Sequence, residues 1–455
     1  MSAPGAAAGA PRPWAGRRLH LVGIGGAGMS AYARAAHALG ASVTGSDVAA
    51  SPYLEALAAD GVVVEVAVGH RAENVPAGDD VEVYHSSAVP AGNPELESAR
   101  ERGLPERGRA ELLGELSSLR RTIAVAGSHG KTTTSAMLVH ALRAAEMDPG
   151  WLVGGAVGGG LGNAHWGEGD WLVVEADESD RSLLSLDVEV AVLTNAELDH
   201  HASYASIEEV RAVFAQFLAH ARVAVVWDRP ELLALAAGSG PETVLPYDAA
   251  GVRLLDGGSE QDFGGVTVRL RVPGAHNALN AAGALTAARA AGADVEKAAD
   301  GLARFEGAGR RFQRLGVTSS GASVYDDYAH HPTEVAATLA AARTLPHRRL
   351  IAVFQPHLYS RTAMLAREFG LALGEADTVA VLDVYPARER AEDHPGVSGL
   401  MIAEAAADAA RGRTVCWLPR MDDAARALPH LINEGDLCVL MGAGDIDALG
   451  RRLVA

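Results

Sequence analysis

A glycine-rich loop at residues 127–133 constrains the fold of this chain more than any other feature. The loop reads Gly-Ser-His-Gly-Lys-Thr-Thr, follows the apolar run 122–126 and opens the helical pattern 134–142. A strand, a glycine turn and a helix in this order place backbone N–H groups and a helix N-terminus around an anion. Lys131 would then reach the β- and γ-phosphates of a nucleotide, and the Thr132 hydroxyl would bind Mg²⁺. The sequence therefore predicts an α/β nucleotide-binding domain.

The loop is shorter than the usual phosphate-binding motif, because Val125 stands where that motif has its first glycine. An ordinary strand-to-helix turn is the alternative interpretation, and Gly-Lys-Thr-Thr at a helix start disfavours it. The residues expected around the phosphates are Gly127, Ser128, His129, Gly130, Lys131, Thr132 and Thr133.

Length and composition limit the class of protein. A chain of 455 residues is too long for one hydrophobic core and indicates roughly three domains. The formal net charge of −18 argues against a nucleic-acid-binding surface. No apolar run approaches the ~18 residues of a membrane span. Cys416 and Cys438 lie in apolar runs typical of buried thiols, so we expect a cytoplasmic protein without a disulfide or zinc site.

Apolar runs and Ala-rich helical stretches alternate along the chain, which predicts three α/β domains with mostly parallel sheets. We expect a disordered tail at 1–16 and domains at 17–118, 119–314 and 315–455. The first and third are expected to be Rossmann-like. The charged stretch 100–119 is expected to be helical. The expected strands are 19–23, 42–46, 62–66, 81–84, 122–126, 171–175, 188–194, 223–227, 263–271, 323–326, 350–354, 378–382 and 437–441.

A second glycine loop, Gly-Ile-Gly-Gly-Ala-Gly at 23–28, lies between the first expected strand and helix, and Asp47 ends the next strand. This pattern matches the dinucleotide-binding fingerprint. The loop itself requires only a diphosphate on a helix N-terminus, so NAD and a UDP-sugar fit equally well. A tight strand-to-helix turn without a ligand is the remaining alternative.

Two acidic clusters follow later apolar runs. Residues 175–180 read Glu-Ala-Asp-Glu-Ser-Asp, and residues 195–201 read Asn-Ala-Glu-Leu-Asp-His-His. Ligands of open parallel sheets collect beyond the carboxyl ends of the strands, so both clusters are expected beside the phosphate loop. Oxygen ligands suit Mg²⁺, and Glu175 and His200 are the metal candidates. Solvated loop acids are the alternative, and His201 stays open as the ligand in place of His200.

Further polar residues stand at the ends of later elements. Asn277 precedes an Ala-rich helix and is either a ligand or the helix N-cap. His330, His357 and Arg361 follow expected strands and would suit a carboxylate, with surface polar positions as the alternative. Arg310 and its neighbour Arg311 lie at a domain junction, where they would form a salt-bridged hinge or reach a phosphate.

Taken together, these segments resemble the Mur ligase family over residues 19–444. Each motif is weak alone, and their common order is specific. The motifs that carry the resemblance are 23–29, 127–133, 175–180, 194–200, 273–280, 305–312, 326–334 and 354–361.

The resemblance implies three domains, which bind a UDP-sugar, ATP and an amino acid in that order. It implies ATP-dependent joining of L-alanine to the carboxylate of UDP-N-acetylmuramate through an acyl phosphate, with Mg²⁺ as cofactor. The implied catalytic residues are Lys131, Glu175, His200, His330 and Arg361. The implied metal ligands are Thr132, Glu175 and His200. Further ATP contacts are His276, Asn277, Asn280 and Arg310. Amino-acid contacts are Tyr328, His330 and Arg361. The implied UDP-sugar contacts are Gly23, Gly25, Gly26, Ala27, Gly28, Met29, Asp47, Ser86, Ser87 and His129.

Three kinds of alternative stay open, the first of which is another ligase. A sister ligase would attach another amino acid, and a recycling ligase would attach a whole peptide. A nicotinamide oxidoreductase would use the loop 23–28 but leaves Lys131 and both acidic clusters unexplained. A non-catalytic nucleotide-binding protein would need a damaged metal site, and none is evident. We expect a monomer or a weak homodimer that takes small-molecule substrates.

Overall fold

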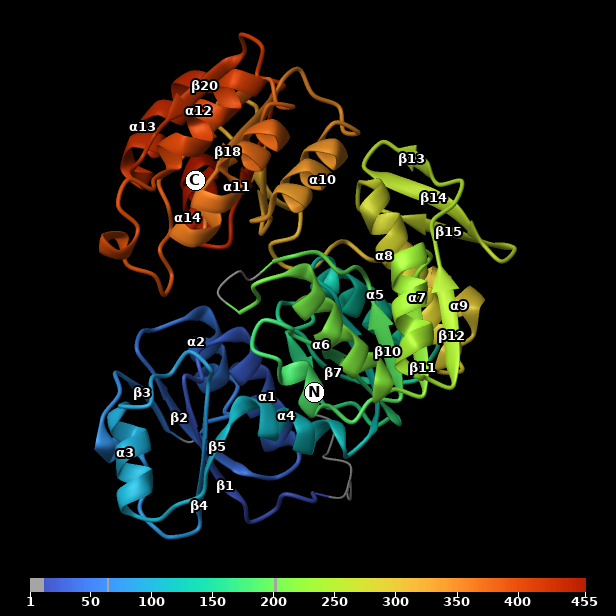
Figure 1. Cartoon of the computed structure of the whole chain (residues 1–455), viewed down its shortest axis with the longest axis vertical. Helices are drawn as coiled ribbons and strands as arrows, with labels where there is room; N and C mark the ends of the chain where they lie inside the picture. The colour runs from blue at the N-terminus through green and yellow to red at the C-terminus, as the bar shows by residue number, and fades with distance from the viewer. Residues whose placement is uncertain (1–11, 64, 200–202) are drawn as a thin grey trace, which may run out of the picture.

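The computed structural model describes residues 12–63, 65–199 and 203–455. Three sheets succeed one another along the described chain, each covered by helices, and Figure 1 shows them as a blue, a green-to-yellow and an orange-to-red body. A small antiparallel sheet extends from the central body. The α/β class with mostly parallel sheets is confirmed.

The N-terminal sheet has the strand order β3-β2-β1-β4-β5, and all four pairings are parallel. Its strands are β1 (Arg18–Val22), β2 (Ser42–Asp47), β3 (Glu65–Val68), β4 (Val81–His85) and β5 (Glu106–Gly108). Its helices are α1 (Ala27–Ala38), α2 (Pro52–Ala59), η1 (Ala72–Asn74), α3 (Pro94–Glu101) and α4 (Arg109–Ser117).

Three expectations for this domain were wrong in detail. The stretch 100–119 is not one helix, because β5 interrupts it. That strand reads Glu-Arg-Gly at the edge of the sheet and has no apolar run to reveal it. The strand expected at 62–66 is assigned as β3 from Glu65, and Val62 and Val63 are buried outside it. The tail predicted to residue 16 is also too long: Trp14 is buried, and its N–H donates to the Leu39 carbonyl.

The central sheet has the order β12-β11-β10-β6-β9-β7-β8, with only β8 antiparallel. Its strands are β6 (Arg121–Ala126), β7 (Gly150–Leu152), β8 (Ala164–His165), β9 (Trp171–Glu175), β10 (Val190–Leu193), β11 (Val223–Trp227) and β12 (Thr243–Tyr247). Its helices are α5 (Lys131–Ala144), η2 (Ser182–Ser185), α6 (Ile207–Ala219), α7 (Pro230–Ser239), α8 (Ala275–Ala290) and α9 (Val295–Ala303).

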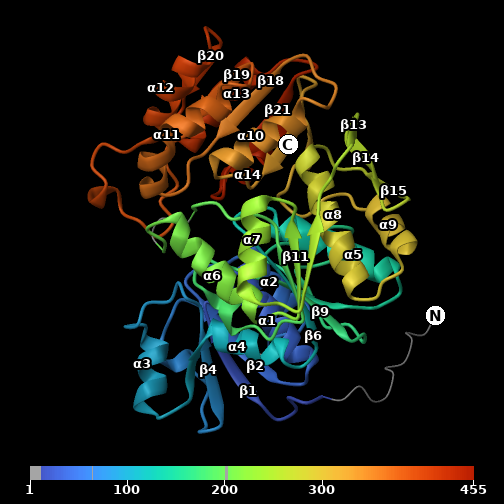
Figure 2. The ribbon, with the colours of Figure 1, turned by 45° about the vertical axis from the view of Figure 1, so that its right-hand side comes forward.

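Helices cover both faces of this sheet (Figure 2). Helices α5, α8 and α9 share one apolar core, and α6 shares the other with residues of α1 and α4, so the N-terminal domain packs against the central one. The small sheet comprises β13 (Arg253–Leu255), β14 (Gly258–Phe263) and β15 (Val266–Leu270). The strand expected at 263–271 therefore begins late, after a Gly264-Gly265 turn in which both φ angles are positive.

The C-terminal sheet has the order β16-β17-β21-β18-β19-β20, with only β16 antiparallel. Its strands are β16 (Gln313–Val317), β17 (Ser323–Asp327), β18 (Leu350–Phe354), β19 (Thr378–Val381), β20 (Thr414–Trp417) and β21 (Leu437–Met441). Its helices are α10 (Pro332–Ala342), α11 (Tyr359–Leu373), η3 (Ala391–Asp393), α12 (Gly399–Ala409), α13 (Met421–Leu431) and α14 (Ile446–Val454). The boundary expected between residues 314 and 315 falls inside β16.

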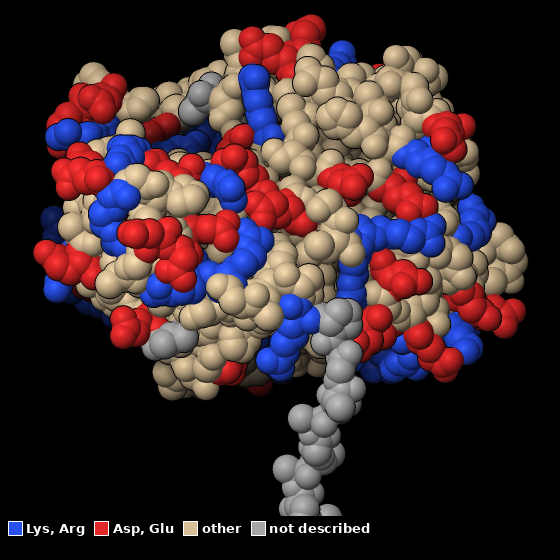
Figure 3. Space-filling view, turned by 90° about the horizontal axis from the view of Figure 1, so that it is seen from below, with Lys and Arg blue, Asp and Glu red and all other residues tan. Residues whose placement is uncertain are grey.

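The surface and the cysteines agree with the composition. Figure 3 shows Lys and Arg interspersed with Asp and Glu on one face of the molecule. Cys438 is buried in β21, Cys416 is half-buried in β20, and both are free thiols. Among the described residues, no helix is both long and apolar enough to cross a membrane.

Candidate functional site

The loop between β6 and α5 needs glycine at two positions. Gly127 has a φ of +130°, and a Cβ there would lie 2.1 Å from Thr194 Oγ1. Gly130 has a φ of +82°, and its Cβ would lie 2.8 Å from Asn280 Oδ1. An L side chain at either position would be strained and would fill the loop. The loop therefore forms a backbone cradle at the N-terminus of α5, which fits a phosphate group.

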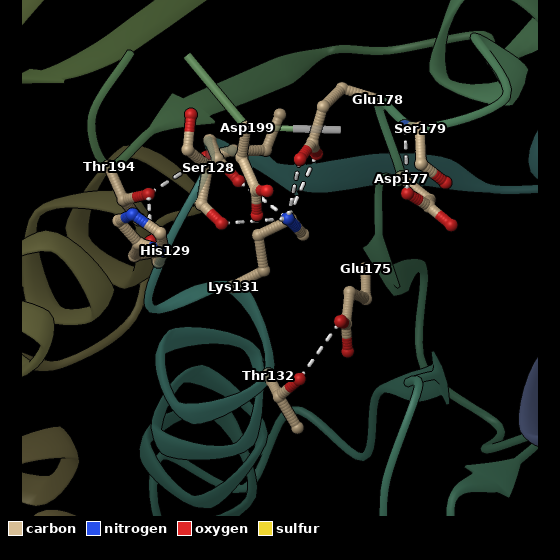
Figure 4. Close-up of polar contacts among 12 residues, drawn as sticks. Ser128, His129, Lys131, Thr132, Glu175, Asp177, Glu178, Ser179, Thr194 and Asp199 are labelled. Atoms are coloured by element: carbon tan, nitrogen blue, oxygen red, sulfur yellow. Dashed lines mark hydrogen bonds and ion pairs between the residues drawn. The ribbon is translucent and has the colours of Figure 1, made fainter. Parts of the chain in front are cut away.

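Lys131 lies at the centre of this cradle (Figure 4). Its Nζ donates to the Gly127 carbonyl at 2.7 Å and lies 2.9 Å from Glu178 Oε2. Burial disfavours the charge, but the carboxylates of Glu178, Asp177 and Glu175 together outweigh burial and raise the pKa of Lys131. Lys131 is therefore an ammonium ion held beside the loop, with a carboxylate as its counter-ion.

Thr132 and Glu175 meet as the metal prediction requires. Thr132 Oγ1 donates to Glu175 Oε1 at 2.9 Å (Figure 4), and the other carboxylate oxygen accepts from the Gly154 N–H at 2.7 Å. A hydroxyl and a carboxylate at this separation are the oxygen donors that Mg²⁺ prefers, so the pair fits the ion. His200 and His201 lie outside the described residues.

A cavity of about 220 Å³ opens beside the phosphate loop, between the central and C-terminal domains. Gly130 and Thr133 contribute to its wall, as do the predicted contacts His276, Asn277 and Asn280. Burial lowers the pKa of His276 to about 4, so its ring is neutral. Apolar side chains and amides next to a phosphate cradle fit a nucleotide. Glu197, Arg311, Asp327 and Glu334 also line this cavity.

The alternative of Asn277 as an N-cap was wrong. Helix α8 begins at Ala275, after Gly274 as its N-cap, and Asn277 lies in the first turn. Its Nδ2 donates to the Pro273 carbonyl at 2.7 Å, which orients the side chain along the cavity wall.

His129 connects the phosphate loop to the C-terminal domain. Its Nε2 lies 3.4 Å from Glu197 Oε2, and its Nδ1 lies 3.3 Å from Glu334 Oε1 of α10. Burial disfavours the imidazolium, but the two carboxylates outweigh it and raise the pKa of His129 to about 9. The neighbouring Ser128 Oγ donates to the Glu197 carbonyl at 2.8 Å, which holds the loop against the segment after β10.

Arg310 does not line the cavity. Its Nε donates to Asp326 Oδ2 at 3.1 Å, and its terminal nitrogens donate to the carbonyls of Gly442 and Gly444. The structure therefore supports the salt-bridged hinge for Arg310, with its guanidinium turned to the C-terminal sheet. Arg311, the other residue of the pair, lines the cavity instead.

Tyr328, His330 and Arg361 come together on the C-terminal side. His330 Nδ1 lies 2.9 Å from the Tyr328 carbonyl, and burial lowers the pKa of His330 to about 4. The rings of His330 and His357 are 6.0 Å apart, and Arg361 Nη1 lies 3.4 Å from His357 Nδ1. A buried arginine beside neutral imidazoles would suit a small zwitterion.

The first glycine loop is held from behind by Asp47. Gly25 N–H donates to Asp47 Oδ2 at 2.8 Å, so this carboxylate supports the loop itself. Gly23 packs against Ser86, and Ser87 is exposed beside it. Gly26 is the N-cap of α1, so Ala27, Gly28 and Met29 form its first turn, with Met29 in the core.

Arg109, at the start of α4, is a residue that the sequence patterns did not reveal. Its Nε lies 2.7 Å from Asp180 Oδ2, and its Nη1 would lie 3.2 Å from a Cβ on Gly28. It therefore joins the first glycine loop to the acidic cluster after β9. The sequence offered little to indicate this role, because Arg109 is one arginine within a charged stretch that was expected to be helical.

Comparisons with known proteins agree with this geometry. The chain matches the Mur ligase family catalytic domain at residues 18–121, the Mur ligase middle domain at 125–288 and the Mur ligase glutamate ligase domain at 310–444. It is 45% identical over 475 residues to the UDP-N-acetylmuramate–L-alanine ligase of Mycobacterium sp. (strain JLS), covering 98% of this chain and 96% of that protein. A relative of the same name from Rhodococcus opacus (strain B4) is 43% identical and covers 96% of both chains.

Solved structures give the same result. The UDP-N-acetylmuramate–alanine ligase of Thermotoga maritima superposes with a TM-score of 0.80 at 27% identity, over 96% of this chain and 98% of that one. A murein peptide ligase from Psychrobacter arcticus superposes with a TM-score of 0.69 at 26% identity, over the same shares. Three domain matches in order, together with near-full-length relatives, show that this chain belongs to the Mur ligase family.

Proposed function

We propose that this chain is an ATP-dependent ligase that joins L-alanine to the carboxylate of UDP-N-acetylmuramate and releases ADP and phosphate. The relatives' names support this reaction, which attaches the first amino acid of the peptidoglycan precursor. The observation that carries the proposal is a cavity whose wall combines residues of the phosphate loop with Asp327 and Glu334 of the C-terminal domain. We place the reaction in the cytoplasm and propose a monomer or weak homodimer.

Two anion sites divide the substrates between domains. The loop 23–28 at the N-terminus of α1 would hold the diphosphate of the UDP-sugar. The loop 127–133 would hold the triphosphate of ATP, with the base in the cavity beside Asn277 and Asn280. Arg109 pairs with Asp180 beside Gly28, which supports a sugar substrate bound next to the acidic cluster 175–180.

In the first step the muramate carboxylate attacks the γ-phosphate of ATP, and these two negatively charged groups repel each other. Lys131 would offset this repulsion, because its ammonium group is fixed beside the loop before the substrates arrive. Thr132 and Glu175 would hold Mg²⁺, which withdraws charge from phosphate oxygens. His200 is proposed as a further ligand by resemblance alone.

The acyl phosphate formed in this step is then attacked by the amine of L-alanine. A carbon–nitrogen bond forms as the carbon–oxygen bond to phosphate breaks. Arg361 would bind the alanine carboxylate, and Tyr328 and His330 would complete the pocket. His330 is the proposed acceptor for a proton of the alanine ammonium group, and burial, which lowers its pKa to about 4, keeps its ring neutral in the substrate-free chain.

The proposal is tested by measuring phosphate release with each component omitted in turn. We expect turnover only when ATP, Mg²⁺, UDP-N-acetylmuramate and L-alanine are all present. Replacing L-alanine by glycine, L-serine or a free murein peptide separates the alanine ligase from its sister and recycling enzymes. Faster turnover with a peptide than with L-alanine, or oxidation of NADH without ATP, would overturn the assignment.

A further inference from the structure

A buried carboxylate in the N-terminal domain takes no part in the reaction described above. Glu95, in the first turn of α3, has no exposed surface. His20 Nε2 lies 2.8 Å from its Oε2, and Asn74 Nδ2 donates to its Oε1 at 2.9 Å. Ser46 Oγ lies 2.7 Å from both carboxylate oxygens. A buried charge needs such donors, because an unpaired charge in the protein interior is strongly unfavourable.

The network reaches the first glycine loop through Ser46. This residue lies near the carboxyl end of β2, and its carbonyl accepts from the Gly23 N–H at 2.8 Å and from the Ile24 N–H at 3.0 Å. The next residue, Asp47, accepts from the Gly25 N–H. Three successive N–H groups of the loop are therefore anchored to two residues of β2, and the following groups at the start of α1 are left to face a ligand.

Glu95 also fixes the neighbouring loop. His70 Nδ1 lies 3.0 Å from Glu95 Oε1, and the Arg71 N–H donates to the same oxygen at 3.3 Å. The N–H of Gly69, the residue before His70, donates to the Asp47 carbonyl at 2.7 Å. The single carboxylate thus holds β2 and the loop after β3 in one arrangement behind the glycine loop.

We propose that Glu95 is a positioning residue for the UDP-sugar: through Ser46 it sets the backbone of the glycine loop that receives the diphosphate. The inference rests on the proposed function, because it presumes that loop 23–28 binds the sugar nucleotide. A small backbone shift at a diphosphate site weakens binding, since several N–H groups must point at the ligand together. Glu95 lies in a different domain from Lys131, so ATP binding is expected to be independent of it.

The test variant is Glu95→Gln, which keeps the shape but places an NH₂ group against the donors. We expect the KM for UDP-N-acetylmuramate, and its Kd by isothermal titration without ATP, to rise about tenfold. We expect the KM for ATP and the kcat at saturating sugar to stay within twofold. Ser46→Ala removes only the hydroxyl link, so it should raise the same KM by about threefold. Glu97→Gln, on the exposed side of α3, is the matched control and should change neither constant.

The outcomes separate positioning from simple support of the fold. A merely structural role would lower the melting temperature and the active fraction of Glu95→Gln, with both substrate constants unchanged, and would overturn the inference. Equal sugar affinity in Glu95→Gln and the unmodified chain would also overturn it. If the unmodified chain itself binds no UDP-N-acetylmuramate, the proposed function fails, and the positioning inference fails with it.

Discussion

Arg361 Nη2 lies 2.7 Å from Asp199 Oδ1, and the two side chains are each only 3% exposed. Arg361 belongs to α11 of the C-terminal domain, whereas Asp199 follows β10 of the central domain. This buried ion pair therefore joins the expected amino-acid site to the acidic cluster behind the phosphate loop.

Removing Arg361 should impair the use of L-alanine. Breaking a buried pair by deleting one partner costs about 3–5 kcal/mol, and Arg361 is also the proposed partner of the alanine carboxylate. We expect Arg361→Ala to raise the KM for L-alanine at least tenfold while the KM for ATP stays within about twofold. Arg367→Ala, at an exposed position of the same helix, is the control. An unchanged alanine KM in steady-state assays would exclude Arg361 from the site.

Lys131→Ala should abolish acyl-phosphate formation and spare the sugar site. The ammonium group lies in the second loop, far along the chain from residues 23–28, and it stabilises charge that develops only at the γ-phosphate. We expect phosphate release to fall by at least about 100-fold, with the Kd for UDP-N-acetylmuramate unchanged by titration calorimetry. Lys297→Ala, an exposed lysine, should behave like the unmodified chain. Loss of sugar affinity in Lys131→Ala would contradict this division of sites.

Gly25→Ala should weaken binding of the UDP-sugar. A Cβ at this position would lie 2.9 Å from Asp47 Oδ2 and 2.9 Å from Ser51 Oγ. The loop must therefore shift to accommodate the methyl group even when no ligand is bound. We expect the KM for UDP-N-acetylmuramate to rise about tenfold with normal ATP affinity. Gly238→Ala meets no atom within 4 Å and is the control. A changed ATP affinity with normal sugar binding would reverse the assignment of the two loops.

The pH dependence of stability should report the pairing of His129. Its pKa is raised to about 9 in the folded chain, against 6.5 in the reference state. The stabilisation is therefore complete below about pH 6.5 and is lost as the pH rises through 9. We expect the melting temperature of the substrate-free protein to fall by a few degrees over this range, and Glu334→Gln to reduce the fall. An identical pH profile in Glu334→Gln would show that the pair contributes nothing.

Local patterns predicted the central elements of the fold well. Buried parallel strands such as β6 and β18 are continuous apolar runs, and the glycine loops carry their own backbone requirements. The polar edge strand β5 could not be found this way, because an edge strand buries little and needs no apolar run. Strand β20 is also an edge strand with half-buried residues at its centre, but its apolar run around Cys416 was visible in the sequence.

Contacts between domains were beyond the reach of sequence patterns. Asp199 and Arg361 are 162 residues apart, and neither neighbourhood indicates that they meet. The sequence could not tell which of Arg310 and Arg311 faces the cavity, because this depends on the backbone. Arg310 adopts a φ of +56°, and its side chain turns to the C-terminal sheet. Asp47 is predicted to contact the sugar nucleotide, and its Oδ2 also accepts from the Gly25 N–H, a contact that the sequence pattern did not indicate.

The most direct test of the proposed chemistry follows one oxygen atom. UDP-N-acetylmuramate labelled with ¹⁸O in its carboxylate is turned over with ATP, Mg²⁺ and L-alanine, and the inorganic phosphate is analysed by mass spectrometry. Attack of the carboxylate on the γ-phosphate, followed by displacement by the amine, must leave one ¹⁸O in the released phosphate. Phosphate without label, formed at the same rate as the alanyl product, would contradict the acyl-phosphate route.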